Sequence, residues 1–490
     1  MTHEPTGSPA RKVAYAALMG LVVALFVGLR LWNLAAVCLD DDEVFSVLVS
    51  RRGWGGLWAA AGDDISHPPL FYLLLKAWML VGGEALLWLR LLPALISFSA
   101  LVPFLLLCRE RRVGPFVTLL ALFLWATNGS LIYYAQHLRD FILLQALSLW
   151  SLWFLARWAG RPEGSRRDLA LLFVSNLLAV YAHYWGWILV GTEFLILLAV
   201  ARRRCLPFLL TSLLLPLFYA PWAMTVVRAV QAKGSATGQI DWIGKPAFRD
   251  LVWFLATVNG ALEFPRSTLV GIALFGAPVL LWCCAALRGR EGEGPAGRGH
   301  LLALLLLAGV PVTITFVASR VLPQSVWATR QLLYSFVPCY LLVGIAAARI
   351  RPPLARGVLA LALCGWSAAA GVLAIRTECV KLPYDKVFET LAARETAEGG
   401  GADRDVVVYA DEGFFLHVAE LYLTERWGYR HVVVDDWKEV KGDRFWVIYR
   451  KAGWKKDPPP QEALARMGYR CGDESLFDAG MRVLIFPVRR

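Results

Sequence analysis

Long apolar runs, separated by short polar segments, fill the chain up to about residue 375. Most runs are close to the ~20 residues that a helix needs to cross the hydrocarbon core of a bilayer. The pattern therefore predicts a polytopic α-helical membrane protein with about eleven transmembrane helices. The expected spans are 13–37, 86–108, 115–135, 138–157, 168–185, 186–201, 205–223, 267–287, 301–319, 331–349 and 356–375.

One apolar segment, HPPLFYLLLKAWMLVGG at 67–83, does not fit this series because it is short and carries Lys76. Pro68 and Pro69 stand at its start, where a helix loses nothing by their missing N–H groups. We expect a juxtamembrane helix on the outer face, amphipathic or partly embedded, with Lys76 at the interface.

The pattern changes at about Arg376, where apolar runs of strand length alternate with helix-like stretches. Such alternation is typical of a small α/β domain with a largely parallel sheet. We therefore expect two domains, a transmembrane domain over 1–375 and a C-terminal α/β domain over 376–490. The expected strands are 405–410, 431–435, 444–449 and 481–488, the expected helices are 412–428 and 458–469, and EGGGADRD at 398–405 predicts a flexible loop.

Composition agrees with a membrane protein, since 58% of residues are hydrophobic, 18% are charged and the mean hydropathy is +0.52. The net charge of +12 does not indicate nucleic-acid binding, because the basic residues form short clusters between apolar runs rather than one patch. The nine cysteines form no CxxC motif, so neither a zinc site nor a disulfide framework is indicated. Cys379 and Cys471 are able to pair if their region is extracytoplasmic, although two free thiols are favoured.

The basic clusters set the orientation, because cytoplasmic loops are enriched in Lys and Arg. With each cluster on the inner side, the chain lies in the cell (plasma or inner) membrane with a cytoplasmic N-terminus, an uncleaved first span and an extracytoplasmic C-terminal domain. The clusters are Arg11 and Lys12; Arg109, Arg111 and Arg112; Arg157, Arg161, Arg166 and Arg167; Arg202 to Arg204; Arg288, Arg290 and Arg298; and Arg349, Arg351 and Arg356.

The same orientation places several separate polar segments on the outer face. They are the acids at 40–43, His67, YYAQHLRD at 133–140, HYW at 183–185 and the loops at 224–266 and 319–330. Ionisable residues that converge on one membrane face predict a site there. A carboxylate, cations, aromatic rings and an apolar groove together suit a lipid-borne sugar phosphate, whose transfer needs a base for the acceptor hydroxyl and positive charge for the leaving phosphate.

Five motifs in order carry a resemblance to a known group. They are DDDEVFSVLVSRR after the first span, HPPLFYLLLKAW at 67–78, YYAQHLRDFILL at 133–144, YAHYWGWILV at 181–190 and RQLLYSFVPCYLLVGIA at 330–346. The chain resembles the GT-C polyprenyl-phosphate-sugar glycosyltransferases, specifically bacterial family 39, which is related to the protein O-mannosyltransferases and the lipid A aminoarabinose transferases. The resemblance covers about residues 13–350 and extends to the α/β tail.

The resemblance implies an inverting transfer from a polyprenyl-phosphate sugar to an acceptor hydroxyl on a glycan, lipid or protein outside the cytoplasm. It implies Asp42 as the general base and Glu43 as its neighbour. The alternative for Asp42 is a helix N-cap before VFSVLVS, and Asp40 and Asp41 are expected to be solvated. No cofactor and no metal are expected, with a divalent cation at the 40–43 cluster as the alternative.

The resemblance also implies donor-phosphate contacts from His67, Arg139 and Arg330, with Arg320 behind them. A packing role for His67 and a snorkelling role for Arg139 are the alternatives. The sequence departs from the family pattern at His137, where Glu is usual, and at Asp140, which is able to pair with Arg139. The residues expected to contact substrate are Tyr133, Tyr134, Gln136, Asp140, His183 and Tyr184, although each aromatic is also an ordinary interface residue and His183 and Tyr184 favour a structural role.

Two other functions compete with a transferase. A transporter or flippase of lipid-linked sugars is the alternative, but such proteins carry internal repeats and mid-membrane charges, whereas the polar clusters of this chain lie at one face. A catalytically silent scaffold with the same fold is the other, and the presence of Asp42, Glu43 and Arg139 argues against it.

Overall fold

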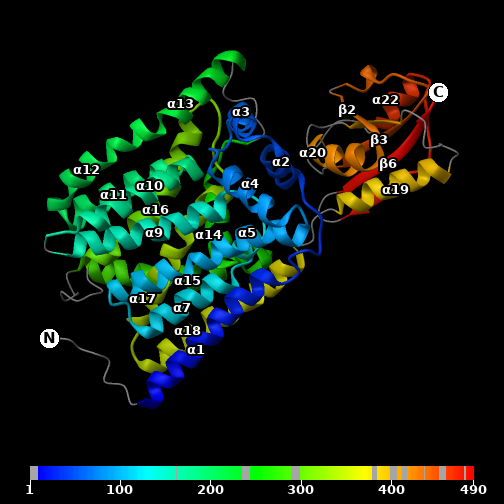
Figure 1. Ribbon diagram of the computed structural model, residues 1–490. Coiled ribbons are helices and arrows are strands. Elements are labelled where there is room, and N and C mark those ends of the chain that lie inside the picture. Colours follow the sequence, from blue (N-terminus) through cyan, green and yellow to red (C-terminus); the bar gives the residue numbers. More distant parts are fainter. Residues whose placement is uncertain are drawn as a thin grey trace. The chain divides into compact units, whose positions relative to one another are not determined.

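The computed structural model describes residues 9–161, 163–233, 243–288, 298–377, 383–397, 406–410, 416–434, 436–451, 460–478 and 482–490 (Figure 1). The chain forms two compact units. The first consists of residues 1–32, 49–83 and 88–375, and the second of residues 33–48, 84–87 and 376–490. The short segment 33–48, which carries the acids that follow the first span, therefore groups with the C-terminal residues.

Helices make up the first unit, and among its described residues 8 helical stretches are long and apolar enough to cross a membrane. Three shorter apolar helices accompany them. The predicted multi-pass helical architecture is confirmed, and each predicted span is found as a helix. The helices that correspond to these spans are α1 Pro9–Leu31, α5 Leu86–Ser99 with α6 Leu101–Glu110, α7 Pro115–Thr127 with α8 Gly129–Tyr134, α9 Phe141–Gly160, α10 Arg166–Ala182, α11 Gly186–Val200, α12 Cys205–Ser212 with α13 Leu214–Lys233, α15 Thr268–Leu287, α16 Arg298–Val321, η4 Thr329–Ser335 with α17 Phe336–Ala348, and α18 Pro353–Thr377.

Two boundaries differ from the prediction by more than five residues. The first span ends at Leu31 rather than at 37, and Asn33 shortly afterwards has a φ of 53°. Asparagine tolerates this left-handed conformation, which ends helices. The helical stretch expected at 205–223 continues to Lys233, and Pro221 lies inside α13 rather than at its end.

Shorter helices lie between the spans. They are α2 Asp41–Arg51, α3 Trp54–Asp64, α4 Leu70–Gly82 and α14 Phe248–Asn259. The expected juxtamembrane helix is α4, and it begins directly after Pro68 and Pro69. Lys76 is not an interface residue, because its side chain is buried and its ammonium donates to the carbonyl oxygens of Arg52 at 2.7 Å and Ser50 at 3.4 Å. Lys76 thus caps the carboxyl end of α2, where the helix dipole favours a cation.

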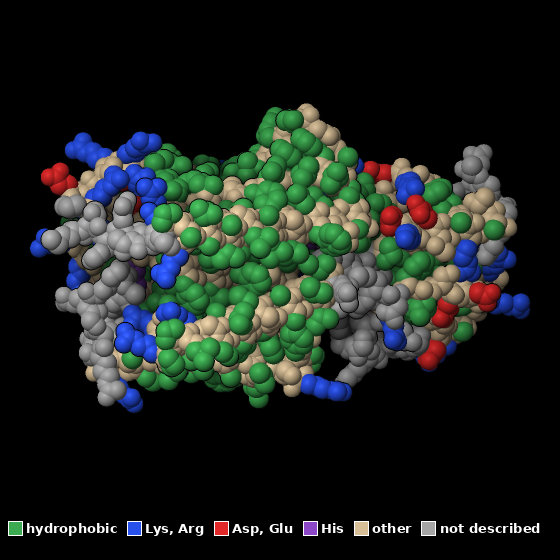
Figure 2. Space-filling view, turned by 90° about the horizontal axis from the view of Figure 1, so that it is seen from below, with side chains coloured by type: hydrophobic (Ala, Val, Ile, Leu, Met, Phe, Trp, Pro, Cys, Tyr) green, Lys and Arg blue, Asp and Glu red, His purple; other side chains and the backbone are tan. Residues whose placement is uncertain are grey.

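Burial separates central from peripheral helices of the first unit. In the spans that contain α9 and α17, 78% and 83% of residues are buried, compared with 11% in α1. The two central helices therefore pack on protein along most of their length, whereas α1 presents most of its surface outward. Figure 2 shows apolar side chains over the length of the bundle and Lys and Arg side chains gathered at one of its ends.

The C-terminal residues form a mixed sheet with helices. Its strand order is β2-β1-β3-β6-β4, with β5 also paired to β6. The pairs β1–β2 and β1–β3 are parallel, but β3–β6, β4–β6 and β5–β6 are antiparallel. The strands are β1 Val407–Ala410, β2 Arg430–Val433, β3 Arg444–Lys451, β4 Arg470–Cys471, β5 Ser475–Asp478 and β6 Arg482–Arg489, and the helices are α19 Tyr384–Ala397, α20 Leu416–Ala419, the π-helical turn Glu420–Thr424, α21 Glu425–Trp427 and α22 Pro460–Arg466.

The small α/β domain is confirmed, whereas the expectation of a largely parallel sheet is wrong. The antiparallel half arises because β6 follows the two short strands β4 and β5, which pair with it as hairpin-like neighbours. Phe445, Val447 and Phe486 are fully buried in the core of this sheet. Cys471 is a free thiol, and Cys379 and the loop at 398–405 lie outside the described residues.

Candidate active site

The acidic segment 40–43 opens helix α2 with a reciprocal cap. The backbone N–H of Glu43 donates to Asp40 Oδ1 at 3.0 Å, and the backbone N–H of Asp40 donates to Glu43 Oε2 at 3.1 Å. This arrangement is a capping box, in which residues N-cap and N3 satisfy each other's helix-terminal donors. The N-cap is therefore Asp40, and the alternative of Asp42 as the cap is wrong. Glu43 is fully buried, whereas Asp42 is half-buried.

Asp41 is tied to the C-terminal residues of the second unit. His417 Nδ1 donates to Asp41 Oδ2 at 3.0 Å, and the backbone N–H of His417 donates to Asp41 Oδ1 at 3.2 Å. The His417 ring also lies 5.0 Å from the ring of Phe45. Burial raises the pKa of the Asp41 carboxyl, and His417 opposes part of that rise. The expectation that Asp40 and Asp41 are merely solvated is wrong, since one caps a helix and the other joins two distant segments.

In the first unit, His67, Asp140 and His183 form a buried cluster. His67 Nδ1 and Asp140 Oδ2 are 2.9 Å apart, and the rings of His67 and His183 are 5.3 Å apart. His67 precedes the proline pair before α4, Asp140 directly precedes α9, and His183 follows α10, so three segments meet here. The exposed fractions are 7%, 2% and 1%, which means that water does not satisfy these polar groups. Asp140 therefore pairs with His67 at this position.

Hydrogen bonds fix the tautomers in the cluster. The backbone N–H of Trp185 donates to His183 Nδ1 at 3.1 Å, so the proton of a neutral His183 is on Nε2. Burial lowers the pKa of His183 to about 3, which agrees with a neutral ring. Burial alone would raise the pKa of Asp140, but the neighbouring His67 and Arg139 lower the pKa to about 2, so Asp140 is ionised. Its charge leaves His67 Nδ1 as the donor.

Three such side chains have the composition of a metal site, since their candidate ligand atoms lie within 4.8 Å of one another. However, a histidine that ligates through one nitrogen donates a proton from the other. His183 cannot do so, because its Nδ1 accepts from Trp185 and its Nε2 carries the proton. Nε2–H is a buried donor that has no hydrogen-bond partner in the described structure, and Oδ1 of Asp140 is an acceptor in the same situation. The cluster therefore fits a hydrogen-bonding ligand better than a metal ion.

Cations surround this cluster. Arg139 precedes Asp140 in the chain and is buried, with an exposed fraction of 6%. The guanidinium carbon of Arg330 lies 5.5 Å from the centre of the Phe141 ring, and this ring is also 5.7 Å from His67 and 5.8 Å from His183. Both arginines lower the pKa of His183 further, which shows that their charges are felt in the cluster. Two cations, Arg139 and Arg330, therefore lie near the ionised carboxylate of Asp140 and the ring of His183.

The other residues predicted to contact substrate differ in their surroundings. The side-chain amide of Gln136 donates to the carbonyl oxygens of Arg30 at 3.0 Å and Trp32 at 2.9 Å, which fastens the end of α1. The Tyr184 hydroxyl donates to the carbonyl oxygen of Ile65 at 2.8 Å, close to His67 in sequence. Gln136 and Tyr184 thus make structural contacts.

The two adjacent tyrosines belong to an aromatic group beside the cluster. The ring of Tyr133 is 5.0 Å from that of Tyr134, and Tyr134 is 5.4 Å from Phe141. Arg320 donates to the carbonyl oxygen of Pro246 at 3.4 Å, so its side chain is directed to that loop. Asp42 and Glu43 belong to the second unit, so their meeting with Arg139 stays a prediction.

Sequence reasoning missed two interior polar groups. Arg30 in α1 is fully buried, and it donates to Ser97 Oγ at 2.9 Å and to backbone carbonyl oxygens of two helices. Glu193 in α11 is also fully buried and contacts Ser151 and Asn176. A lone charge inside an apolar run marks a functional or structural polar contact in a membrane, and this signal was available for both.

No protein-family model matches the chain, and no curated protein matches its sequence. Solved structures are similar in fold. The chain is similar to ArnT from Cupriavidus metallidurans in the apo state, with 14% identity, 98% of each chain covered and a TM-score of 0.52. For the same protein bound to undecaprenyl phosphate the identity is 13%, the coverage is 98% of each chain and the TM-score is 0.54.

The archaeal oligosaccharyltransferase AglB from Archaeoglobus fulgidus is also similar. Its complex with an inhibitory peptide and a dolichol-phosphate is 14% identical, covers 85% of this chain and 64% of its own chain, and has a TM-score of 0.53. Both neighbours are GT-C enzymes. The chain therefore has the GT-C fold, as its motifs predicted.

Proposed function

We propose that this protein is a membrane glycosyltransferase that moves a sugar from a polyprenyl-phosphate donor to an acceptor hydroxyl on the outer membrane face. The observation that carries the proposal is the buried cluster at the start of α9, where the Nε2–H donor of His183 lacks an acceptor and Arg139 and Arg330 supply positive charge. A phosphate monoester or diester supplies an acceptor for the Nε2–H of His183, and its negative charge suits the two nearby guanidinium groups. The fold shared with an undecaprenyl-phosphate-bound protein supports the same ligand class.

In the proposed reaction, Asp42 accepts the proton of the acceptor hydroxyl while its oxygen attacks the anomeric carbon. The bond between that carbon and the phosphate oxygen breaks, and the electron pair leaves with the polyprenyl phosphate. Arg139 and Arg330 stabilise the charge that develops on this phosphate, and His183 donates a hydrogen bond to it. Attack opposite the leaving group inverts the anomeric configuration. Asp140 holds His67 through Nδ1 and so presents the other ring nitrogen to the donor.

Contacts within the second unit suggest a role for the C-terminal domain. His417 binds Asp41, and the hydroxyl of Tyr422 accepts from the backbone N–H of Leu39 at 2.9 Å. These two contacts involve Leu39 and Asp41, directly before the proposed base Asp42, and therefore hold the acidic segment in place. The domain thus positions Asp42, in addition to any part it has in acceptor binding.

The buried contact among Ser151, Asn176 and Glu193 does not favour a transporter. Its members satisfy one another, with Asn176 donating to Glu193 at 2.7 Å and Ser151 donating to Asn176 at 2.7 Å. A transport site instead needs polar groups that are left available to a substrate. The trio fits a clamp between helices α9, α10 and α11.

The test compares cells that produce the wild-type protein with cells that produce Asp42→Asn. Mass spectrometry of glycolipids and glycoproteins is expected to show one sugar modification that depends on the protein and is absent with Asp42→Asn. Asp473→Asn, an exposed acid of the same unit, serves as the matched control. Full modification by Asp42→Asn at equal membrane levels would exclude Asp42 as the base.

The orientation is proposed from the arginine clusters. A reporter fused after residue 110 is expected on the cytoplasmic side, and one fused after residue 380 on the outer side. The reverse result would place the cluster around Asp140 on the inner face. It would then contradict the proposed transfer on the outer membrane face.

A further inference from the structure

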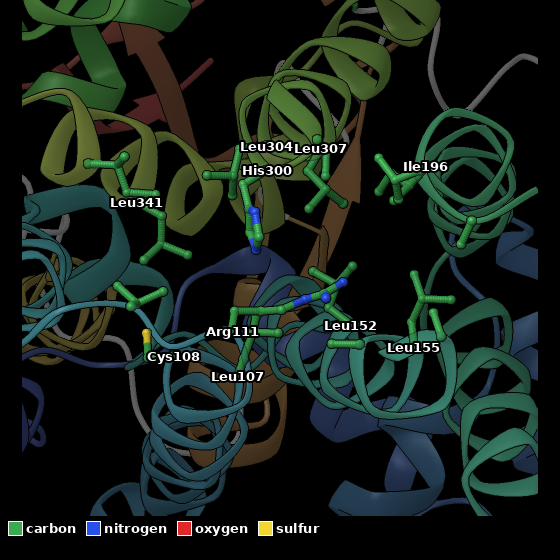
Figure 3. Close-up of a pocket in the computed structure, with 18 residues that line it drawn as sticks. Leu107, Cys108, Arg111, Leu152, Leu155, Ile196, His300, Leu304, Leu307 and Leu341 are labelled. Carbon is green, nitrogen blue, oxygen red and sulfur yellow. The ribbon is translucent and has the colours of Figure 1, made fainter. Parts of the chain in front are cut away.

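A cavity lies between helices far from the buried cluster of His67, Asp140 and His183. Its volume is about 310 Å³, and it is enclosed by α6, α9, α11, α16 and α17 (Figure 3). Its walls are apolar over most of their surface. The aliphatic side chains that form them include Leu107, Leu152, Leu155, Ile196, Leu304 and Leu341.

Two basic side chains enter this apolar cavity. Arg111 follows the carboxyl end of α6, and His300 stands in the first turn of α16. Figure 3 shows both side chains reaching into the cavity, His300 from α16 and the Arg111 guanidinium extending toward the side of Leu152. Both are only half-exposed, and within the described ranges neither makes an ion pair or a side-chain hydrogen bond. An arginine that merely snorkels would direct its guanidinium into water and away from the aliphatic walls.

Helix α9 extends from the Asp140 cluster to the cavity, so its length gives the distance between the two sites. Asp140 immediately precedes this 20-residue helix, whereas Ala156 and Ala159 near its other end line the cavity. At a rise of 1.5 Å per residue, the helix spans about 30 Å, which is the thickness of the hydrocarbon core. The cavity therefore belongs to the opposite membrane surface from the Asp140 cluster. This is the end of the bundle where Lys and Arg side chains gather in Figure 2.

We infer that this cavity binds an anionic phospholipid, with its phosphate between Arg111 and His300 and part of an acyl chain among the leucines. The Arg111 guanidinium favours an anion, His300 offers a second hydrogen-bond donor beside it, and the aliphatic walls favour a hydrocarbon chain, so one amphiphile satisfies all three. A volume of about 310 Å³ is at the low end of the range for ligand pockets, which suits one chain segment rather than a whole lipid. Basic pockets between helices at the cytoplasmic surface are known to recognise lipid headgroups.

Native mass spectrometry of the full-length protein in detergent tests the inference. Phosphatidylglycerol and phosphatidylcholine with identical acyl chains are the two probes. One phosphatidylglycerol per chain is expected to remain bound after phosphatidylcholine has dissociated. The Arg111→Gln/His300→Gln double variant is expected to lose this adduct by about tenfold, because the charged contact of Arg111 and the ring contact of His300 to the phosphate are both gone. Arg109→Gln, an exposed arginine in the same turn of α6, is the matched control and should retain the adduct.

Two further experiments test whether a lipid rather than a free phosphate binds, and whether it binds in the cavity rather than on the protein surface. Excess glycerol phosphate, which has the headgroup without the chains, should not displace the lipid, whereas displacement would show that the chain contributes nothing. Leu155→Trp fills the cavity without removing a charge and should also weaken the adduct. Equal binding of both lipids, or an unchanged adduct in the double variant and in Leu155→Trp, would overturn the inference.

Discussion

Two aspartate–histidine pairs of nearly equal length serve different purposes in the two units. His67 Nδ1 lies 2.9 Å from Asp140 Oδ2, and His417 Nδ1 lies 3.0 Å from Asp41 Oδ2. The pairs differ in how the carboxylate is used. Both oxygens of Asp41 accept from His417, one from the ring and one from the backbone, whereas Oδ1 of Asp140 is buried without a hydrogen-bond partner in the described structure.

The difference indicates which pair is prepared for a ligand. A satisfied carboxylate fixes two segments to each other, so the Asp41 pair is a structural fastener. A buried acceptor and a buried donor without partners carry a free-energy cost that the fold retains only for a reason, such as a ligand that completes the network. The pair of Asp140 is also surrounded by Arg139, Arg330 and His183, whereas the pair of Asp41 contacts Phe45.

The largest effect is expected from Asp140→Asn. Loss of the charge leaves His67 without its buried carboxylate partner, and breaking such a buried pair costs about 3–5 kcal/mol. If this cost falls on the transition state, glycosyl transfer slows by about 10² to 10⁴ fold. The measurement is the initial rate of donor consumption by purified protein, corrected for the folded fraction by size-exclusion chromatography.

The matched control for that variant is Asp168→Asn at the other end of the same helical pair. Asp168 is equally buried, but Arg157 and Arg161 lie 3.2 and 3.0 Å from it and form a plain ion-pair anchor. We expect Asp168→Asn to lower thermal stability and leave the rate per folded molecule unchanged. Equal rates for Asp140→Asn and Asp168→Asn would show that Asp140 is an anchor too.

A smaller effect is expected from breaking the other pair with His417→Ala. The variant removes a charged hydrogen bond worth about 1.5–3 kcal/mol, so the acidic segment gains freedom and transfer falls by about tenfold. Hydrogen exchange of the amides in 39–46 should become faster, which a loss of overall stability alone would not confine to this segment. His417→Asn keeps a side-chain donor for Asp41 and should restore part of the rate.

The contrary outcome for this pair is equally specific. If His417→Ala exchanges its 39–46 amides at the wild-type rate, the C-terminal domain does not position the acidic segment. If exchange rises while transfer stays constant, the segment is held by His417 but its order does not matter to the reaction, and Asp42 loses support as the base.

The hydrophobic pattern predicted most of the fold, because a transmembrane helix is a local feature of about 20 residues. The apolar runs that became α9 and α17 were found with nearly correct ends. The direction of strand pairing was not predictable in this way, because the apolar sequences of β3 and β6 are compatible with parallel and with antiparallel pairing. The two strands pair antiparallel. The α19 helix was missed because its amphipathic pattern follows a change of composition near Arg376.

The site was only partly predictable, for a related reason. The sequence motifs identified His67, Arg139, Asp140 and His183 as candidates, but not that His67 and Asp140 pair with each other across 73 positions. His417 lies 376 positions from Asp41 and carries no local signature of its role. Pairing of distant polar side chains depends on tertiary packing, which periodicity does not encode.

The smallest effect concerns the pH dependence of stability. The pKa of His183 is lowered from 6.5 to about 3 in the folded protein. Between these values the unfolded chain binds a proton at this position and the folded protein does not, so the free energy of unfolding falls as the pH decreases through this range. The loss amounts to about 2 kcal/mol on going from pH 6.5 to 5.

In His183→Asn, the amide oxygen still accepts from the Trp185 N–H and the NH₂ group still donates, but nothing titrates. We therefore expect the apparent unfolding midpoint, measured by tryptophan fluorescence at a fixed scan rate, to fall less between pH 7 and 5 in His183→Asn than in the wild type. Parallel pH dependences would mean that the proton of His183 is not excluded from the folded state, and the assignment of Nε2–H as a donor held ready for phosphate would lose its basis.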